Sequence, residues 1–336
     1  MKASVIGGGS WGSAFALYLG RQKIKTKLWI REPDIFETAK NEGQNKVFLP
    51  GFFFPPEVSF HHDLEEALSA ADLIFVAVPS QFCRKTYSHM APYLSRDQVV
   101  ISLTKGIEKK TLMRMSEVMD EVFKPFRQPR LAVLSGPSFS KEVAEGHPTA
   151  VVLASAEPDL ARQVQHFISS LSLRVYTSRD IIGVELAGAL KNVIAIAAGI
   201  SDALAFGYNS RAALVTRGLS EIGRLGLKLG AKKETFSGLA GMGDLVLTCT
   251  GPLSRNRHVG FELGKGRPLS AIIASMRMVA EGIVTTLSSR QLARRENVEM
   301  PISEQVYLIL YKNKNPQHAL VDLMSRTLRD EEGSLP

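Results

Sequence analysis

One lysine stands inside an almost wholly apolar stretch in the second half of the chain. Lys191 lies within the run AGALKNVIA, residues 187–195. Apolar surroundings remove water from an ammonium group and lower its pKa toward working pH, so this lysine could give and take a proton at a reacting oxygen. The alternative that the sequence leaves open is a lysine whose ammonium extends from the edge of a helix into solvent. Asn192 follows directly, and one polar pair on an apolar helix indicates a lined pocket.

The N-terminus carries a glycine pattern that suits a diphosphate. Gly7, Gly9 and Gly12 have the spacing G-x-G-x-x-G, directly after a short apolar strand at residues 3–6 and at the start of a helix expected for residues 10–20. In that context the first glycine permits a tight turn, the second lets the backbone approach a pyrophosphate, and the third lets helix and strand pack closely. The helix N-terminus offers free N–H groups to the phosphates. We therefore expect a nicotinamide dinucleotide here, the alternative being a plain glycine turn.

The residues after the second expected strand bear on which dinucleotide is used. An acidic residue is expected about 20 positions beyond the glycines, where it would bind the ribose hydroxyls of NAD. This chain has Arg31 and Glu32 there. Arg31 could hold the 2′-phosphate of NADP and stack on the adenine, whereas Glu32 could hold a 2′-hydroxyl. We favour NADP or the use of both cofactors.

Further polar residues follow apolar strands or lie in the helical half. Lys105 ends the strand at residues 99–103, and ligands of doubly wound sheets bind beyond the carboxyl ends of strands. The alternative for this cation is a lysine in a surface turn. The run SGPSF at residues 135–139 ends the next strand, so its backbone and hydroxyls could line the same cleft. Asp244 is flanked by glycines, and Ser254, Arg255 and Asn256 combine a guanidinium, an amide and a hydroxyl, which suits a phosphate. Ser254 could instead be a helix N-cap.

These residues need a scaffold, and the pattern of elements predicts it. Apolar runs at residues 3–6, 26–30, 73–78, 99–103, 131–134, 150–154 and 174–177 alternate with helical stretches. Continuous rather than alternating runs indicate strands buried on both faces, hence a parallel sheet covered by helices. The first half is therefore predicted to be an α/β Rossmann-type doubly wound domain, residues 1–180. From Ile181 onward the pattern is helical, including an apolar helix at 184–204, and predicts an all-α domain at residues 181–330. The polar tail from Arg329 to Pro336 is expected to fray.

Composition limits the class of protein. The chain has 336 residues, 45% hydrophobic and 22% charged, which is typical of a globular protein of about two domains. The net charge of +8 is dispersed, so it favours anionic small molecules over nucleic acid. Cys83 and Cys249 have no disulfide or zinc spacing, and His61-His62 does not suggest a metal, so we expect no metal and a reducing, cytoplasmic location. No signal peptide and no membrane span are expected.

Several segments, in their order and spacing, resemble one known family over nearly the whole chain. They are residues 7–12, 102–106, 134–139, 185–192, 238–245, 254–256, 279–282 and 300–302. The family is that of the NAD(P)-dependent glycerol-3-phosphate dehydrogenases of bacterial type. The resemblance implies a Rossmann domain and a helical domain with the site in the cleft between them. It implies interconversion of dihydroxyacetone phosphate and sn-glycerol 3-phosphate, which feeds phospholipid synthesis.

The resemblance also implies roles for individual residues. The proton donor and acceptor corresponds to Lys191, and Lys105 corresponds to a residue that contacts both cofactor and substrate. Substrate contacts are implied for Gly136, Ser138, Asp244, Ser254, Arg255 and Asn256. Cofactor contacts are implied for Ser10, Trp11, Arg31, Arg255, Val279 and Glu281. Members usually have alanine where this chain has Ser140 beside the cofactor, and a hydroxyl there could add a hydrogen bond.

The residue types and the family resemblance indicate the same mechanism. Hydride passes from C4 of the nicotinamide to C2 of dihydroxyacetone phosphate while Lys191 protonates the oxygen, with Lys105 and Asn192 as electrostatic support. Arg255 and Asn256 would hold the phosphate. The helical half could supply an interface, and we expect a homodimer. The rival interpretations are another two-domain dehydrogenase, for a 2-hydroxy acid or 6-phosphogluconate, and an inactive module that only senses the dinucleotide.

Overall fold

The protein is described by a computed structural model that covers residues 1–126, 128–328 and 330–331. The chain forms two compact units. The sheet unit comprises Met1–Thr104 and Met115–Ile181, and the helical unit comprises Lys105–Arg114 with the described residues from Ile182 onward. No pattern in the sequence predicted that the ten residues from Lys105 to Arg114 group with the helical unit. The tail expected to fray lies mostly outside the described residues.

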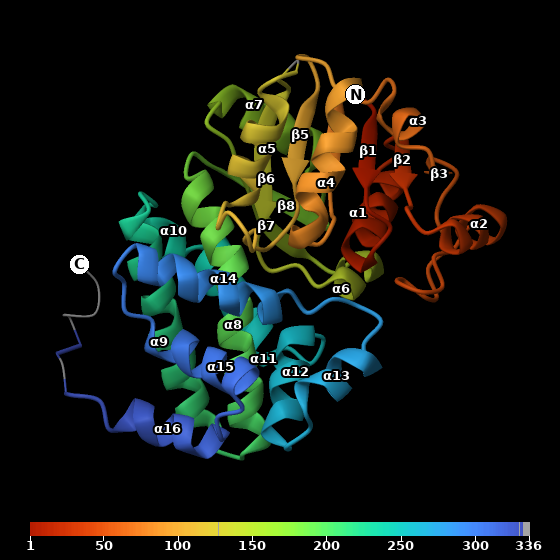
Figure 1. The fold of residues 1–336 in the computed structure, drawn as a ribbon. Coiled ribbons are helices and arrows are strands. Elements are labelled where there is room, and N and C mark those ends of the chain that lie inside the picture. Colours follow the sequence, from red (N-terminus) through yellow and green to blue (C-terminus); the bar gives the residue numbers. More distant parts are fainter. Residues whose placement is uncertain (127, 329, 332–336) are drawn as a thin grey trace. The chain divides into compact units, whose positions relative to one another are not determined.

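The sheet unit is built on one eight-stranded sheet among the described residues (Figure 1). The strands are β1 (Ala3–Ile6), β2 (Thr26–Trp29), β3 (Val58–His61), β4 (Leu73–Val76), β5 (Val99–Ser102), β6 (Arg130–Ser135), β7 (Thr149–Ala154) and β8 (Leu173–Ser178). Their order is β3-β2-β1-β4-β5-β6-β7-β8. The order reverses at β1, which pairs in parallel with both β2 and β4. Dinucleotides bind doubly wound sheets at such a switch point.

The sheet differs from the prediction in two places. The β6–β7 pair is antiparallel, with Leu134 opposite Leu153, so the sheet is mixed rather than wholly parallel. Continuous apolar runs look alike in either direction, so the sequence could not reveal this. Strand β3 was not predicted, because only Val58 of its four residues is buried and an apolar run is missing. The fully buried strands β1, β4 and β5 were the easiest to recognise.

Helices of the sheet unit connect these strands (Figure 1). They are α1 (Ser10–Arg21), α2 (Pro33–Glu42), α3 (Leu64–Leu68), α4 (Ser80–Met90), a 3₁₀ turn η1 (Ala91–Tyr93), α5 (Met115–Phe123), α6 (Ser140–Glu145) and α7 (Pro158–Ile168). Phe15 of α1 contacts Phe75 of β4 with 4.8 Å between ring centroids, and both side chains are fully buried. This packing fixes the middle of α1 on β4, the strand that pairs with β1.

The helical unit contains no strand among its described residues; besides helices and loops it has one isolated β-bridge, between Ile107 and Arg114. Its helices are α8 (Ile181–Ala203), α9 (Gly207–Lys228), α10 (Lys233–Ser237), the π-helical turn η2 (Leu239–Gly243), α11 (Asp244–Thr250), α12 (Arg255–Gly264), α13 (Leu269–Ser275), α14 (Glu281–Arg295), α15 (Pro301–Lys312) and α16 (Pro316–Met324). Within the described chain, α8 alone is long and apolar enough to cross a membrane. Most of it is buried inside the protein, as in a core helix.

A buried carboxylate joins two helices of this unit. Glu221 of α9 accepts hydrogen bonds from the backbone N–H groups of Ile302 and Ser303 at 2.5 and 3.1 Å, and from the Ser303 hydroxyl at 3.0 Å. It therefore caps the N-terminus of α15. Burial outweighs these donors and raises the pKa of Glu221 from 4.5 to about 7.

This raised pKa predicts a pH dependence of stability. The unfolded chain releases the Glu221 proton near pH 4.5 and the folded chain near pH 7, so the free energy of unfolding falls by about 3 kcal/mol across that range. Glu221→Gln should lack this component. Urea denaturation of both proteins at pH 5 and pH 8 measures it, with Glu304→Gln on α15 as the control. Equal pH dependence of wild type and Glu221→Gln would contradict the assignment.

Candidate active site

The glycine loop has the geometry that a dinucleotide requires. Gly7 has a φ of +121°, and a Cβ atom there would lie 2.7 Å from the Ala77 carbonyl oxygen. A Cβ atom on Gly12 would lie 1.9 Å from the Gly7 carbonyl oxygen, so α1 packs against the turn at a distance only glycine allows. A Cβ atom on Gly9 would meet nothing within 4 Å, so the space over this backbone is open to a ligand. These are the three roles expected of the pattern.

The start of α1 also offers hydrogen-bond donors. Gly9 is the N-cap of this helix and provides no side-chain cap, so the first-turn N–H groups are not capped by it. The indole Nε1 of Trp11 is buried and, within the described part of the chain, finds no hydrogen-bond acceptor. A buried donor without a partner is costly. A pyrophosphate at this helix end would satisfy both features, so the loop fits a nicotinamide dinucleotide.

The Gly9 and Gly12 positions allow a matched prediction. Gly12→Ala forces a methyl group onto the Gly7 carbonyl, and we expect a stability loss of about 1–3 kcal/mol together with weaker cofactor binding. Gly9→Ala introduces no clash in the protein. It should keep the wild-type stability but raise the Kd for NADPH about tenfold or more, because the methyl group occupies the ligand's space. Thermal unfolding and fluorescence titration with NADPH measure both effects. Equal stability of the two variants would refute the close-packing role of Gly12.

Arg31 and Glu32, beyond the end of β2, are the candidate partners of a 2′-phosphate or a 2′-hydroxyl, and in this structure they bind each other. The Arg31 Nη2 atom lies 2.5 Å from Glu32 Oε1, and the Arg31 guanidinium lies 5.6 Å from the ring centre of Phe82. The Arg31 side chain is 62% exposed. Its guanidinium thus presents one face to an aromatic ring and remains accessible to a ligand.

Lys191 and Lys105 share one buried carboxylate in the helical unit. Lys191 Nζ lies 2.6 Å from Asp244 Oδ1, and Lys105 Nζ lies 2.7 Å from Asp244 Oδ2. Lys191 Nζ also donates to the Thr248 hydroxyl at 2.6 Å. The Asp244 side chain is 1% exposed and the Lys191 side chain 7%. The alternative of a Lys191 ammonium in solvent is therefore not what the structure has.

This environment lowers the pKa of Lys191 from 10.5 to about 8. Burial is the main cause, since it disfavours the charged ammonium, and the positive charge of Lys105 acts in the same direction. The Asp244 carboxylate opposes both but does not cancel them. A lysine with this pKa exists in both protonation states near neutral pH, which is what a group that gives and takes protons requires.

A tight turn places the shared carboxylate. The π-helical turn η2 ends at Gly243, and Asp244 begins α11 directly after it. A Cβ atom on Gly241 would lie 2.2 Å from the Phe236 carbonyl oxygen, so this turn needs glycine. Thr248 is one helical turn after Asp244 and lies on the same face. No role was predicted for Thr248, although its spacing of four from Asp244 was a usable signal.

A chain of amides lies beside the lysines. The Asn192 Nδ2 atom donates to the Lys105 carbonyl oxygen at 3.4 Å, and Asn256 Nδ2 donates to Asn192 Oδ1 at 2.8 Å. Asn256 Oδ1 in turn accepts from the Gly282 N–H at 2.9 Å. Asn256 was expected to hold a phosphate. Here its carboxamide orients Asn192 and the first turn of α14.

Arg255 and its neighbours start α12. The Ser254 hydroxyl accepts from the Arg257 N–H at 3.2 Å, so Ser254 is the helix N-cap that the sequence left open. Arg255 Nη1 donates to the Val279 carbonyl oxygen at 3.1 Å, and Arg255 is an exposed residue. Val279 is 47% exposed, and Glu281 begins α14 two residues later. The helical unit therefore brings together Lys105, Lys191, Asn192, Asp244 and Asn256, with Arg255 at the next helix start.

The remaining predicted residues belong to the sheet unit. Gly136 follows β6 with a φ of +136°, and the Ser138 hydroxyl donates to its carbonyl oxygen at 2.9 Å. Ser140 is the first residue of α6. A positive φ at Gly136 turns the chain at the end of the strand, which brings the two serines onto the following loop and helix.

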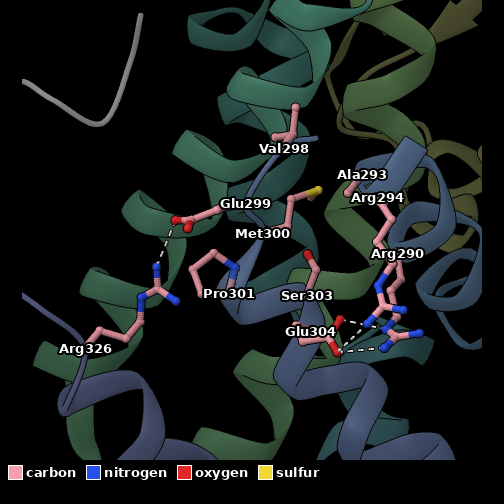
Figure 2. Close-up of a pocket in the computed structure, with 10 residues that line it drawn as sticks. All are labelled: Arg290, Ala293, Arg294, Val298, Glu299, Met300, Pro301, Ser303, Glu304 and Arg326. Carbon is pink, nitrogen blue, oxygen red and sulfur yellow. Dashed lines mark hydrogen bonds and ion pairs between the residues drawn. The ribbon is translucent and has the colours of Figure 1, made fainter. Parts of the chain in front are cut away.

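A pocket of about 220 Å³ lies at the junction of α14 and α15 (Figure 2). Its wall is rich in ion pairs: Glu304 binds Arg290 at 2.7 Å, and Glu299 binds Arg326 at 3.1 Å. None of the predicted site residues lines it. In the described residues no group of three or more His, Cys, Asp or Glu could hold a metal ion.

Comparisons with known proteins show which family the chain belongs to. Residues 2–161 match the family model of the N-terminus, and residues 180–321 that of the C-terminus, of NAD-dependent glycerol-3-phosphate dehydrogenase. The glycerol-3-phosphate dehydrogenase [NAD(P)+] of Syntrophotalea carbinolica is 51% identical over 331 residues, covering 98% of this chain and 99% of the relative. That of Koribacter versatilis is 52% identical over 327 residues, covering 97% of each chain.

A solved structure extends the likeness to three dimensions. The crystal structure of glycerol-3-phosphate dehydrogenase from Coxiella burnetii has a TM-score of 0.93 and 40% sequence identity, covering 97% of this chain and 99% of that chain. The eight-stranded sheet with its connecting helices is thus a Rossmann-type fold, followed by a helical region, as predicted. The chain is an oxidoreductase that uses NAD(P), and it belongs to the family of NAD(P)-dependent glycerol-3-phosphate dehydrogenases.

Proposed function

We propose that the chain reduces dihydroxyacetone phosphate to sn-glycerol 3-phosphate and that Lys191 protonates the C2 oxygen. Bound NAD(P)H supplies the hydride. The observation that carries the proposal is the buried Lys191 ammonium, whose pKa of about 8 lets it lose a proton to a forming alkoxide near neutral pH. The reaction runs in reverse when the same amine takes the proton from the alcohol.

Asp244 and Lys105 support this transfer in different ways. The Asp244 carboxylate fixes the Lys191 ammonium through a 2.6 Å ion pair, and the Thr248 hydroxyl fixes it from a second direction. The Lys105 ammonium keeps a positive charge near the reacting oxygen after Lys191 has given up its proton. Asn192 is proposed as electrostatic support: its carboxamide donates to the carbonyl oxygens of Lys105 and Gly188 and accepts from Asn256, which holds it beside Lys105.

The substrate phosphate is assigned to Arg255. Its exposed guanidinium can make paired charge-assisted hydrogen bonds to a phosphate. The Ser254 hydroxyl and the remaining Asn256 N–H group are proposed to add single hydrogen bonds to the same phosphate. Arg255→Ala should raise the KM for dihydroxyacetone phosphate about ten- to hundredfold with a smaller change in kcat, because a hydrogen bond to a charged group is lost. Steady-state kinetics measures this, with Arg267→Ala as the control. An unchanged KM would remove Arg255 from the phosphate site. Gly136 and Ser138 are proposed to contact the substrate as well.

Both cofactors are proposed to bind, with NADPH preferred. Arg31 offers its guanidinium to a 2′-phosphate, and the Glu32 carboxylate beside it can accept from a ribose hydroxyl. Trp11, Ser10, Ser140, Val279 and Glu281 are proposed cofactor contacts. The deciding experiment measures oxidation of NADH and NADPH side by side, first with dihydroxyacetone phosphate and then with 2-keto acids. Turnover with 2-keto acids alone would overturn the proposed substrate, and binding without turnover would leave only a sensor.

The setting of the enzyme is also a proposal. We propose that its product feeds glycerophospholipid synthesis and that it acts in the cytoplasm, where both buried cysteines would stay reduced. We further propose a homodimer, in which exposed apolar side chains near the C-terminus of the described chain, Val321 and Met324, would be covered. Light scattering of the purified protein tests the dimer, and a monomer at micromolar concentration would refute it.

A further inference from the structure

The ten residues from Lys105 to Arg114, here called the Lys105 arm, form part of the helical unit although the sheet unit flanks them in the sequence. The arm lies between β5 and α5, yet it groups with the residues after Ile182. Ile107 is fully buried and belongs to the same apolar cluster as Leu186 and Leu190 of α8. Apolar burial of this kind fixes the middle of the arm on the helical unit.

The arm closes on itself so that its two ends lie together. Ile107 and Arg114 form an antiparallel bridge, and the Glu108 N–H donates to the Met113 carbonyl oxygen at 3.0 Å. The Leu112 N–H donates to the Glu108 carbonyl oxygen at 3.0 Å, which completes the turn. A residue that holds Arg114 in place therefore also limits the movement of Lys105.

Arg114 is held by a buried ion pair. Its Nη1 atom lies 2.7 Å from Oε2 of Glu185, and the side chains are 14% and 6% exposed. Glu185 precedes Lys191 by six residues on α8, about 9 Å along the helix. At the other end of the arm, Lys105 reaches Asp244 at 2.7 Å, and its carbonyl oxygen accepts from Asn192. Helix α8 thus holds both ends of the arm.

We infer that the Arg114–Glu185 ion pair is a positioning device that keeps the Lys105 ammonium beside Asp244 and Lys191. The pair is distinct from the ion pairs that Lys105 and Lys191 make with Asp244. The ion pair anchors the arm to α8, the helix that carries Lys191. The two lysines and Asp244 are thereby assembled within the helical unit. This inference rests on the proposed roles of Lys191 and Lys105 in catalysis.

The inference predicts a kinetic effect that general destabilisation would not produce. In Glu185→Gln and Arg114→Met the arm loosens and the Lys105 ammonium leaves Asp244. We expect kcat to fall about 10- to 100-fold, the scale of misplaced catalytic groups. The positive charge of Lys105 lowers the pKa of Lys191. Its departure should therefore move the fall of kcat/KM for reduction, plotted against pH, upward from about pH 8; this fall is called the alkaline limb.

The control and rescue variants use matched ion pairs. Arg114→Lys keeps a cation for Glu185 and should restore most of kcat and the position of the alkaline limb. Glu304→Gln breaks the Arg290–Glu304 pair of the same unit (Figure 2) and should change neither.

A second measurement tests the anchoring itself and does not depend on the reaction. Amide hydrogen exchange of residues 106–113, followed by mass spectrometry, should be faster in Glu185→Gln than in wild type and unchanged in Glu304→Gln. Unchanged exchange would overturn the anchoring, and faster exchange with an unmoved alkaline limb would overturn the positioning role. If Glu185→Gln does not fold, Arg114→Met is judged by the same two criteria. Failure of the proposed function itself shows separately, as near-normal turnover of Lys191→Ala.

Discussion

Lys191→Ala is expected to lower kcat for reduction of dihydroxyacetone phosphate by a factor on the order of 10²–10⁴, the usual contribution of a positioned general acid. The alanine variant has no group at this position that can protonate the alkoxide. Cofactor binding should not change, because Lys191 is not among the proposed cofactor contacts and the glycine loop belongs to the sheet unit. Stopped-flow measurement of NADPH oxidation gives kcat, and a fluorescence titration gives the Kd for NADPH.

The pH dependence of the wild type provides an independent check. Reduction requires the protonated amine, so its rate should fall as pH rises through about 8, whereas oxidation of the alcohol should rise over the same range. Lys228→Ala, at an exposed lysine in the last turn of α9, should leave both profiles as they are. Near-normal turnover of Lys191→Ala would remove this residue from the mechanism.

Asp244→Asn should damage both stability and catalysis. Its carboxylate neutralises two ammonium groups, and removal of one partner from a buried pair costs about 3–5 kcal/mol because the remaining charge is left without compensation. The negative charge of Asp244 raises the pKa of Lys191, so its loss should move the alkaline limb of the kcat/KM profile to lower pH. We expect kcat to fall about 10²-fold as the ammonium loses its fixed position.

Two measurements separate these effects. Urea denaturation gives the change in the free energy of unfolding, and the pH profile of kcat/KM gives the shift of the alkaline limb. Asp322→Asn breaks an exposed pair with Lys314 in the same unit and serves as the control, with no change in either quantity expected. If the alkaline limb moved to higher pH, or if the stability equalled that of wild type, the Asp244 carboxylate would not be what stabilises the Lys191 ammonium.

The variants of the Lys105 arm and Asp244→Asn are expected to shift the alkaline limb in opposite directions. Loosening the Lys105 arm removes a cation from Lys191 and should move the alkaline limb upward, while Asp244→Asn removes an anion and should move it downward. General damage to the fold has no reason to produce opposite signs. The pair of experiments therefore separates electrostatic control of Lys191 from a loss of structure.

Local patterns in the sequence were enough for the dinucleotide loop. The positive φ of Gly7 and the close approach at Gly12 arise from residues that are neighbours along the chain, so spacing alone encodes them. The apolar segment around Lys191 left two alternatives, a desolvated ammonium or one that extends into solvent, and the structure has the buried one. The buried strands were predictable because both of their faces are apolar.

Contacts between distant residues were decided only by the tertiary structure. Asp244 is 139 residues from Lys105 and 53 from Lys191, and no local pattern shows that one carboxylate serves both. The same holds for the antiparallel β6–β7 pair, for Asn256 as the partner of Asn192, and for the Lys105 arm as part of the helical unit. The sequence by itself determined which groups are available and which of them lie in apolar segments, whereas the burial of Lys191 and Lys105 was decided by the structure. Their pairing depends on which surfaces pack together, because a hydrogen bond or an ion pair forms only between atoms that folding has brought within about 3 Å.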